Sequence, residues 1–411
     1  MPKQDIVVGL DVGTTKVSAC IGGYKEGAIE IKAITKAINS GLRRGMVVDI
    51  EDTVSAISAV LEESERMAGT PITSAIIGIG GSHITSADSK GVIAISRADG
   101  EITEDDATRV IDAARAVAMP PNQEIIHIIP KTFTIDGQTG IKDPIGMVGV
   151  RLEVETHVIG GSIAAIKNLS RSITQAGLEI DALVFSPLAT AKALLSKKQK
   201  EMGVLMVDFG AATTGIAIFE EGDLVHCNVL PVGSMHITND IAIGLRISLD
   251  AAEKIKLKYA TALSENIKED EKVDLSKFDP KEEEKISKKY ISEIVDARLD
   301  EIFSLIKNEL KKVGRDGMLP AGAIFTGGGC NLDGLVEYSK QNLRLPAQIG
   351  YPMHELSGIV DKLDDPIYTT SVGLMLWGME EEGIRDNSKF DVLKISGIGN
   401  KLKSFFKNFM P

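Results

Sequence analysis

The sequence predicts an α/β protein with two related lobes. Short strands rich in β-branched residues alternate with amphipathic helices along the chain, a pattern typical of α/β folds. A strand followed by Asp-x-Gly and threonines occurs near the N-terminus and again in the middle of the chain. The 411 residues, 43% of them hydrophobic, suffice for two domains or one large bilobal one. A bilobal α/β fold with an internal duplication satisfies all three observations.

Charge and cysteine content exclude several functional classes. The net charge of −12 argues against nucleic acid as a partner, because phosphate-backbone binding needs clustered positive charge. The three cysteines, Cys20, Cys227 and Cys330, are widely spaced, which fits a reducing compartment and gives no zinc or iron–sulfur site. Asp11 interrupts the first apolar run, so we expect no signal peptide, and no apolar stretch is long enough to span a membrane.

The first elements follow from periodicity and capping signals. Strands are expected at residues 6–10, 17–22 and 29–34. An amphipathic helix should then begin at Asp52, which we expect to be its N-cap, and end at Gly69.

The next helix should run from Glu104 to Ala118, with Thr103 as N-cap and Asp106 three residues later. The segment 124–137 that follows is expected to be a strand. Further along, residues 264–293 are rich in acids and lysines, which is most simply a solvated outer face of helices and a loop.

The internal repeat carries the chemistry. In each copy a strand ends in an Asp-x-Gly turn, with Asp11 and Asp208 in equivalent places and Gly13 and Gly210 in the turns. Glycine lets the backbone approach a ligand, and successive N–H groups in such a turn form an anion-binding concavity to which hydroxyls add donors. Two facing turns would hold a polyphosphate from both sides. The predicted phosphate-binding residues are Gly13, Thr14, Thr15, Lys16, Gly210, Ala211, Ala212, Thr213 and Thr214.

The two aspartates of the repeat are candidate metal ligands. Asp11 and Asp208 are acceptor-only groups that would lie beside the phosphates. Mg²⁺ keeps most of its waters and takes few carboxylates, so we expect both to hold Mg²⁺ through water.

Two further segments complete a nucleotide site. Gly327, Gly328 and Gly329 lie between an apolar strand and a helix expected to begin near Asn331 or Leu332. This bare backbone could admit a flat ring or a phosphate. Glu253 and Lys256 are spaced i, i+3 on a helix and could hydrogen-bond ribose hydroxyls. Alone, that pair would be an ordinary surface ion pair.

The order of these motifs resembles the actin, Hsp70 and sugar-kinase superfamily, and the chain is most similar to the FtsA family of bacterial cell-division proteins. The closer resemblance rests on the segments 40–50, 127–137, 140–159 and 366–378 and covers essentially the whole chain. It implies an actin-like bilobal ATPase fold with duplicated hairpin phosphate turns, an ATP cleft and an inserted subdomain, 1C. The implied parts are 1–83, 162–199 and 359–379 for subdomain 1A, 84–161 for 1C, 200–246 and 320–358 for 2A, and 247–319 for 2B.

One departure from the wider superfamily concerns hydrolysis. Chaperone and filament relatives carry an acidic or amide residue near the start of the helix that links the lobes, whereas here Ser186 precedes Pro187. A hydroxyl is a far weaker base than a carboxylate, so we expect slow or negligible ATP hydrolysis and a structural role for the nucleotide.

The C-terminal end predicts a membrane contact. Residues 380–397 are polar and charged, as in a flexible linker, and residues 398–411 form an amphipathic, cationic helix on a wheel. The alternative is a helix that docks on the protein's own core. The predicted membrane-binding residues are Ile398, Lys401, Leu402, Phe405, Phe406, Lys407 and Phe409.

The resemblance implies a cell-division function. Members self-assemble on the cytoplasmic face of the cell membrane at the septum, tether the tubulin-like protein FtsZ through its C-terminal peptide, and recruit later division proteins through 1C. The implied peptide-binding residues are Arg298, with Lys288 or Lys289. An actin-like pilus-assembly adaptor and a small-molecule kinase on the same fold are the alternatives.

Overall fold

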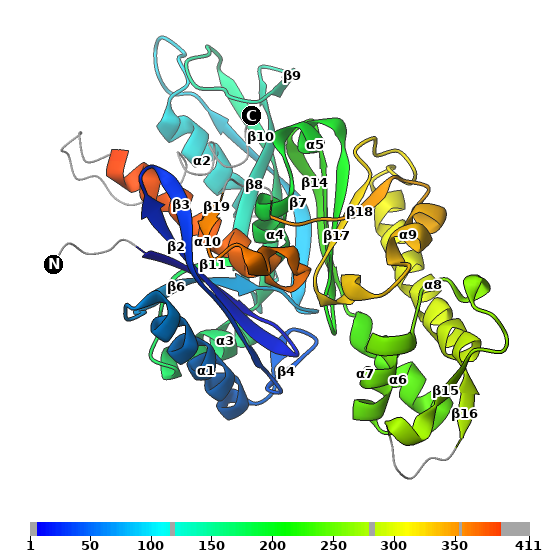
Figure 1. Ribbon diagram of the computed structural model, residues 1–411. Coiled ribbons are helices and arrows are strands. Elements are labelled where there is room, and N and C mark those ends of the chain that lie inside the picture. Colours follow the sequence, from blue (N-terminus) through cyan, green and yellow to red (C-terminus); the bar gives the residue numbers. More distant parts are fainter. Residues whose placement is uncertain (1–5, 116–119, 279–283, 353–355, 388–411) are drawn as a thin grey trace.

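The structure is a computed structural model that describes residues 6–115, 120–278, 284–352 and 356–387 (Figure 1). Two lobes, each built on a sheet of its own, lie on either side of a pair of crossing helices, and a smaller sheet joins them at one end. The predicted amphipathic segment 398–411 lies outside the described residues.

The first lobe contains a six-stranded sheet in the order β11-β6-β1-β2-β3-β19. β1, β2 and β3 form an antiparallel meander, and β6 lies parallel to β1 on its other side. Buried side chains of these strands, such as Leu10 and Ile77, form most of the core of this lobe. The strands are β1 (Ile6–Val12), β2 (Lys16–Lys25), β3 (Ala28–Ile38), β6 (Ser74–Ile79), β11 (Glu179–Phe185) and β19 (Leu356–Gly358).

The second lobe repeats this arrangement, which confirms the predicted duplication. Its sheet has the order β14-β13-β12-β17-β18, again with an antiparallel meander and a parallel neighbour. Asp11 pairs with Gly78 of the parallel strand in the first lobe, and Asp208 pairs with Thr326 in the second, so the two aspartates are structurally equivalent. The strands are β12 (Val204–Phe209), β13 (Thr214–Glu220), β14 (Asp223–Leu230), β17 (Ala323–Thr326) and β18 (Ala347–Ile349).

Two helices cross between the lobes. They are α4 (Ser186–Leu194) and α10 (Thr369–Asn387), which lie at the centre of Figure 1. Their backbones approach so closely that a Cβ on Gly373 would lie 1.9 Å from the carbonyl oxygen of Ala189, so this crossing requires glycine. α4 packs against strands of both sheets, which places its N-terminus between the two lobes.

The insertion forms a separate small sheet with its own core. Its strand order is β7-β10-β8-β9, and α2 packs on it around Val110, Phe133 and Leu152. Ser86 donates a hydrogen bond to the backbone oxygen of Cys227 over 3.0 Å, so this sheet also contacts the second lobe. The elements are β7 (Ile84–Ala94), α2 (Glu104–Arg115), β8 (Gln123–Ile135), β9 (Gln138–Ile141) and β10 (Arg151–Ser162).

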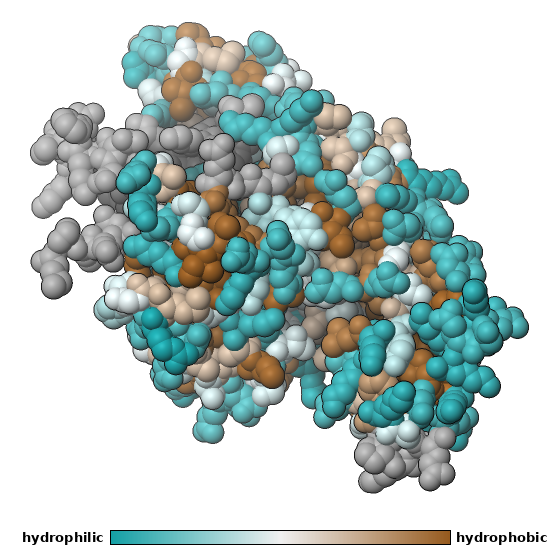
Figure 2. Space-filling view, in the orientation of Figure 1, coloured by the Kyte–Doolittle hydropathy of each residue, from teal (hydrophilic) through white to brown (hydrophobic). Residues whose placement is uncertain are grey.

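A helical part extends from the second lobe at the lower right of Figure 1. Figure 2 shows a mostly hydrophilic surface over this part, as expected for residues 264–293. The structure has short 3₁₀ turns and a two-stranded hairpin in that segment before its helix starts, rather than only helices and a loop. The main elements are α6 (Ser234–Leu245), α7 (Leu249–Tyr259), β15 (Lys272–Asp274), β16 (Lys285–Ser287) and α8 (Lys288–Lys312).

Several element boundaries differ from the predictions. The N-cap of α1 (Ile50–Ala68) is Asp49, not Asp52, because the Asp49 side chain accepts the N–H of Asp52; the predicted end at Gly69 is confirmed. Thr103 and Asp106 form the predicted reciprocal cap of α2. The remaining elements are β4 (Leu42–Arg43), β5 (Met46–Val47), α3 (Ile163–Gln175), α5 (Lys197–Met202) and α9 (Leu335–Leu343).

At the C-terminal end, α10 continues through residues 380–387, the first part of the segment predicted as a linker. Gly383 lies inside this part of the helix and does not end it, so the polar composition and this glycine did not predict how far α10 extends within the described residues. Within the described ranges, no helix combines the length and the hydropathy needed to cross a bilayer.

Candidate functional site

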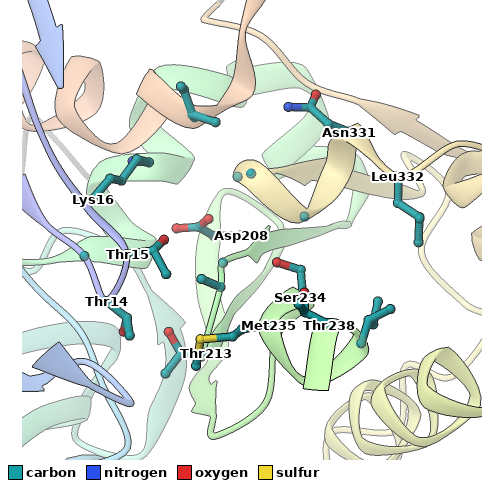
Figure 3. A pocket seen from close by; sticks show the side chains of 18 of the residues that line it. Thr14, Thr15, Lys16, Asp208, Thr213, Ser234, Met235, Thr238, Asn331 and Leu332 are labelled. Atoms are coloured by element: carbon teal, nitrogen blue, oxygen red, sulfur yellow. The ribbon is translucent and has the colours of Figure 1, made fainter. Parts of the chain in front are cut away.

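A cleft of about 1130 Å³ opens between the two lobes (Figure 3). Thr15 and Lys16 from the first lobe and Asp208 from the second point into the same space. The cleft therefore brings together most of the predicted nucleotide-binding and metal-binding residues. Those that line it are Asp11, Gly13, Thr14, Thr15, Lys16, Asp208, Gly210, Ala211, Thr213, Glu253, Lys256, Gly327, Gly328 and Gly329.

The first turn is closed by the N–H of Gly13, which donates to the backbone oxygen of Lys16 over 2.9 Å. A Cβ on Gly13 would lie 2.9 Å from that same oxygen, so the turn needs glycine. The turn is held in place by Asn39, whose side-chain amide donates to the Gly13 oxygen, and by Gly45, whose N–H donates to Thr14 Oγ1 over 3.2 Å. Because that bond uses the oxygen of Thr14, its hydroxyl proton stays available for a ligand.

The second turn has the same geometry. The N–H of Gly210 donates to the backbone oxygen of Thr213 over 3.0 Å, and a Cβ on Gly210 would lie 2.8 Å from that oxygen. The start of α6 supports the turn, because the N–H groups of Ser234 and Met235 donate to the backbone oxygens of Gly210 and Ala211. The sequence repeat thus corresponds to a repeat of hydrogen bonding.

Two predicted phosphate-binding residues lie behind the turn instead of lining the cleft. Ala212 is 1% exposed and packs in the interior. Thr214 is fully buried, and its hydroxyl donates to the backbone oxygen of Val232 over 2.8 Å. The strand alternation of β13 turns this side chain inward, so its donor is used by the fold.

The two aspartates carry charge that the protein only partly compensates. Lys16 Nζ lies 3.5 Å from Asp11 Oδ2. Burial, and then the nearby carboxylate of Asp11, raise the pKa of Asp208 to about 6, while Lys16 and a hydrogen bond from Thr370 act in the opposite direction. A cation between the carboxylates would relieve this repulsion.

These residues fit a hydrated magnesium ion better than a metal held by the protein alone. The described ranges contain no group of three or more His, Cys, Asp and Glu side chains able to hold a metal ion. Two carboxylates beside two phosphate turns are the donor set that Mg²⁺ uses when waters and phosphate oxygens supply its other ligands.

The glycine loop lies against Asp208. Gly327 has φ +87°, and a Cβ there would lie 2.5 Å from Asp208 Oδ1. Gly329 lies against the ring of Phe209, whereas a Cβ on Gly328 would meet only Ile367, at 3.5 Å. The loop continues into a 3₁₀ turn up to Asn331, so α9 begins later than the sequence predicted.

Glu253 and Lys256 are more than an exposed ion pair. Their charged groups lie 2.8 Å apart, but the Lys256 side chain is only 10% exposed. Lys256 Nζ also donates to Thr238 Oγ1 over 2.9 Å, and Thr238 in turn donates to Glu253. This network holds both side chains at the wall of the cleft. Thr238 was not predicted, because no local motif marks a threonine of α6 that contacts α7.

Ser186 lies at the start of α4, the helix that links the lobes, and on the cleft wall. Its Oγ lies 3.0 Å and 3.4 Å from the positions that a Cβ on Gly78 or Gly80 would take. The hydroxyl thus packs against bare backbone at the base of the cleft, between the lobes.

The predicted peptide-binding residues all lie on α8 but not together. Arg298 forms a two-bond ion pair with Asp240 of α6, at 2.5 Å and 2.9 Å, and also contacts Glu301. Lys288 and Lys289 lie about ten residues earlier, roughly 15 Å along the helix axis, and pair with other carboxylates. The structure therefore separates Arg298 from the two lysines.

A buried polar contact between the insertion and the second lobe was not predicted. His157 Nδ1 lies 2.8 Å from Asp88 Oδ1, and its Nε2 lies 3.4 Å from Cys227 Sγ. His226 of the same strand as Cys227 bonds to Glu309 over 2.7 Å. Burial raises the pKa of the Cys227 thiol, so this cysteine is an unreactive packing group.

Comparison with known proteins identifies two families of domain along the chain. Residues 205–373 match a family described as Cell division protein FtsA, and residues 81–160 match the SHS2 domain inserted in FTSA. Similar curated proteins are described as Cell division protein FtsA. That of Pseudomonas aeruginosa is 38% identical over 92% of this chain and 90% of its own length. That of Bacillus subtilis is 35% identical over 91% and 84%.

Solved structures show the same fold. A PilM–PilN type IV pilus biogenesis complex matches 91% of this chain and 99% of the other at a TM-score of 0.68 and 17% identity. MreB5 of Spiroplasma citri bound to ADP covers 95% of this chain and 100% of its own at a TM-score of 0.55 and 15% identity. These matches confirm the predicted actin-like bilobal fold, and the SHS2 match confirms the predicted insertion.

Proposed function

This chain belongs to the FtsA family of cell-division proteins, and on that premise we propose that it is an ATP-dependent membrane tether of the division machinery. It binds Mg²⁺ and ATP in the cleft between its lobes. It self-assembles on the inner face of the cytoplasmic membrane at the septum and holds FtsZ there. Family membership favours this role over a pilus-assembly adaptor or a small-molecule kinase.

The observation that carries nucleotide binding is the pair of matching turns that face one cleft. Each turn is closed by a glycine N–H and supported by its own lobe, and each follows an aspartate at the same strand position. A related fold, MreB5, is named as bound to ADP and to AMPPNP. A polyphosphate between the turns would join the lobes through both sets of donors.

The metal would neutralise charge. Bound Mg²⁺ would offset the negative charge of the two carboxylates and of the phosphates. Asp11 and Asp208 would hold it through water, and Lys16, which already contacts Asp11, would add positive charge at the phosphates. Glu253 and Lys256, fixed by Thr238, would face the ribose side of the cleft.

Hydrolysis should be slow in this cleft. Ser186 stands at the start of α4, where the resemblance to chaperone and filament proteins of the wider superfamily implies an acidic or amide residue. A hydroxyl is a far weaker base than a carboxylate. The nucleotide then acts chiefly as a structural ligand that closes the cleft and permits self-assembly.

Membrane binding is assigned to the amphipathic segment 398–411. Each lysine near an anionic leaflet contributes about 1 kcal/mol, and each well-buried Phe or Leu about 1.5–3 kcal/mol before ordering costs are subtracted. One such helix is a weak anchor, whereas a filament presents many of them at high effective concentration. Filament formation and membrane binding should therefore reinforce each other.

Co-sedimentation with anionic liposomes tests this role. The full chain should pellet with lipid, more so with Mg²⁺ and ATP, and a truncation after Asn387, which keeps all of α10, should not. The double substitution Phe405→Ser and Phe406→Ser in the full-length chain should behave like the truncation. Equal pelleting of full-length and truncated chains would contradict the assignment of the membrane contact to this segment.

FtsZ binding is assigned to the surface around Arg298. Lys288 and Lys289 are the less favoured part of it, because they lie at the start of α8, about ten residues before Arg298. Arg298→Glu would place an acid beside Asp240 and Glu301, and should weaken binding of the FtsZ C-terminal peptide by about tenfold or more. Lys311→Glu, an exposed change on the same helix, is the matched control and should bind normally. If Arg298→Glu binds the peptide as tightly as Lys311→Glu does, the peptide binds a different surface of the protein.

A further inference from the structure

Two hydroxyls lie beside Asp208, where the crossing helices meet, and one of them belongs to Thr370, which lines the cleft. Thr370, in the first turn of α10, donates from Oγ1 to Asp208 Oδ2 over 3.3 Å. Thr190 of α4 lies next in line, with its Oγ1 2.9 Å from that of Thr370. Thr190 is fully buried and Thr370 is 6% exposed. One of these hydroxyls, that of Thr370, therefore bonds to a carboxylate of the cleft, and the other lies next to it.

The direction of the hydrogen bonds follows from the groups. An ionised carboxylate can only accept, so Thr370 is the donor in its bond to Asp208. Thr190 donates its own proton to the backbone oxygen of Ser186 over 2.9 Å, so toward Thr370 it can only accept. The other oxygen of Asp208 lies against the backbone of Gly327. The carboxylate is therefore fixed from two sides, by a donor on Oδ2 and by close packing on Oδ1.

We propose that Thr370 is a positioning residue for Asp208 and that it orients this carboxylate toward hydrated Mg²⁺ at the phosphates. The proposal rests on the proposed binding of Mg²⁺ and ATP. Partners behind a metal ligand fix its orientation, and their loss typically lowers metal affinity 10–100-fold. Thr370 also belongs to the helix that leads to the C-terminal segment, so the metal site and that helix share one hydrogen bond.

The neighbouring threonine provides a matched control. Thr369 is fully buried in the same turn, but its hydroxyl accepts from Thr326 over 2.8 Å and contacts the backbone oxygen of Pro366. Replacing it removes an interior hydroxyl of the same helix turn without touching the bond to Asp208.

The test is a titration of the full-length chain with a fluorescent ATP analogue, in Mg²⁺ and in EDTA. Thr370→Val should weaken binding about 10–100-fold in Mg²⁺ and leave binding in EDTA unchanged. Thr370→Ser, which keeps the hydroxyl donor, should bind the analogue as tightly in Mg²⁺ as the wild-type chain does. Thr369→Val should retain the full Mg²⁺ effect even if its unfolding temperature falls. Should Thr370→Val not fold, Thr370→Ala, which also removes the donor to Asp208, answers the same question.

Several results would overturn the proposal. If Thr370→Val loses affinity for the ATP analogue equally in Mg²⁺ and in EDTA, Thr370 only packs and does not position Asp208. The same conclusion follows if Thr370→Ser binds as weakly as Thr370→Val. A wild-type chain that binds ATP equally with and without Mg²⁺ would overturn the positioning role and leave nucleotide binding intact. A wild-type chain that binds no ATP would overturn both this inference and the nucleotide part of the proposed function.

Discussion

Gly327 lies so close to Asp208 that a Cβ on the glycine would come 2.5 Å from Oδ1 of the aspartate. The glycine belongs to the loop after β17 and the aspartate to the end of β12, so this contact fits the glycine loop against the second phosphate turn. The backbone oxygen of Phe209 lies 2.7 Å from the same Cβ position, so a side chain has no room on either side.

Gly327→Ala should therefore damage the cleft more than an alanine at an open glycine position would. The glycine has φ +87° and ψ 167°, a backbone conformation that essentially only glycine adopts and that costs another residue about 1–3 kcal/mol. The contact with Asp208 adds displacement of the carboxylate. We expect loss of Mg²⁺-dependent ATP binding together with a lower unfolding temperature. Gly314→Ala is the control: its φ is +68°, and a Cβ would meet no atom of the described residues within 4 Å. It should lose some stability and keep ATP binding, measured by titration and thermal unfolding.

The raised pKa of Asp208 predicts a pH effect with a definite sign. Its pKa is about 6 in the fold against an ordinary 3.8, so the folded state holds the proton more tightly than the unfolded state. In the ligand-free protein the ionised group therefore lowers stability above pH 6, and this cost disappears as the pH falls from about 6 to about 4. Asp208→Asn should raise the unfolding temperature at pH 7.5 and have no such effect near pH 4. A lower unfolding temperature for this variant at pH 7.5 would contradict the assignment.

The contact between Asp88 and His157 in the insertion predicts that stability falls, instead of rising, as the pH is lowered. The hydrogen bond from His157, followed by the contact with Lys131, holds the pKa of Asp88 at about 2 despite partial burial. The stability that the ionised Asp88 gives the folded state is present above about pH 4 and is lost as the pH falls toward 2. Because the side chain is 66% exposed, Asp88→Asn should cost no more than about 1 kcal/mol at pH 7. Asp181→Asn, a change at an exposed acid of β11, is the control and should cost nothing measurable in the same urea titrations.

The hydroxyl of Ser186 should not act in hydrolysis. Ser186→Ala should leave the slow ATP turnover of the full chain essentially unchanged, measured as released phosphate under single-turnover conditions. Ser186→Asp places a carboxylate at the same point of the cleft and should raise the rate of ATP hydrolysis. General-base catalysis by such a group typically accelerates a reaction about 10²–10⁴-fold. A large fall in turnover for Ser186→Ala would show that the hydroxyl takes part.

The sequence predicted the parts of the site that depend on local backbone geometry. Gly13 and Gly210 close their turns as the repeat required, and the glycine loop lies beside Asp208. It did not predict contacts between distant segments, such as Thr370 with Asp208, which are 162 residues apart. It also assigned Thr214 to the cleft, because a repeat of residue types does not show which side of a strand each side chain takes.

Helix ends show the same limit. Asp49 and Asp52 both offer a capping carboxylate, and only the path of the chain before α1 selects Asp49. Residues 380–387 are polar and contain Gly383, yet they belong to α10, so their helical state could not be read from composition.

The most direct test of nucleotide binding is a calorimetric titration of the full-length chain with ATP, in Mg²⁺ and in EDTA, beside the Asp208→Asn variant. We predict a single site in the wild-type chain whose affinity rises with Mg²⁺, and a variant in which Mg²⁺ has little effect. Absence of ATP binding to the wild-type chain in Mg²⁺, or an equal Mg²⁺ effect in both chains, would contradict a cleft in which Asp208 holds the metal beside the phosphates.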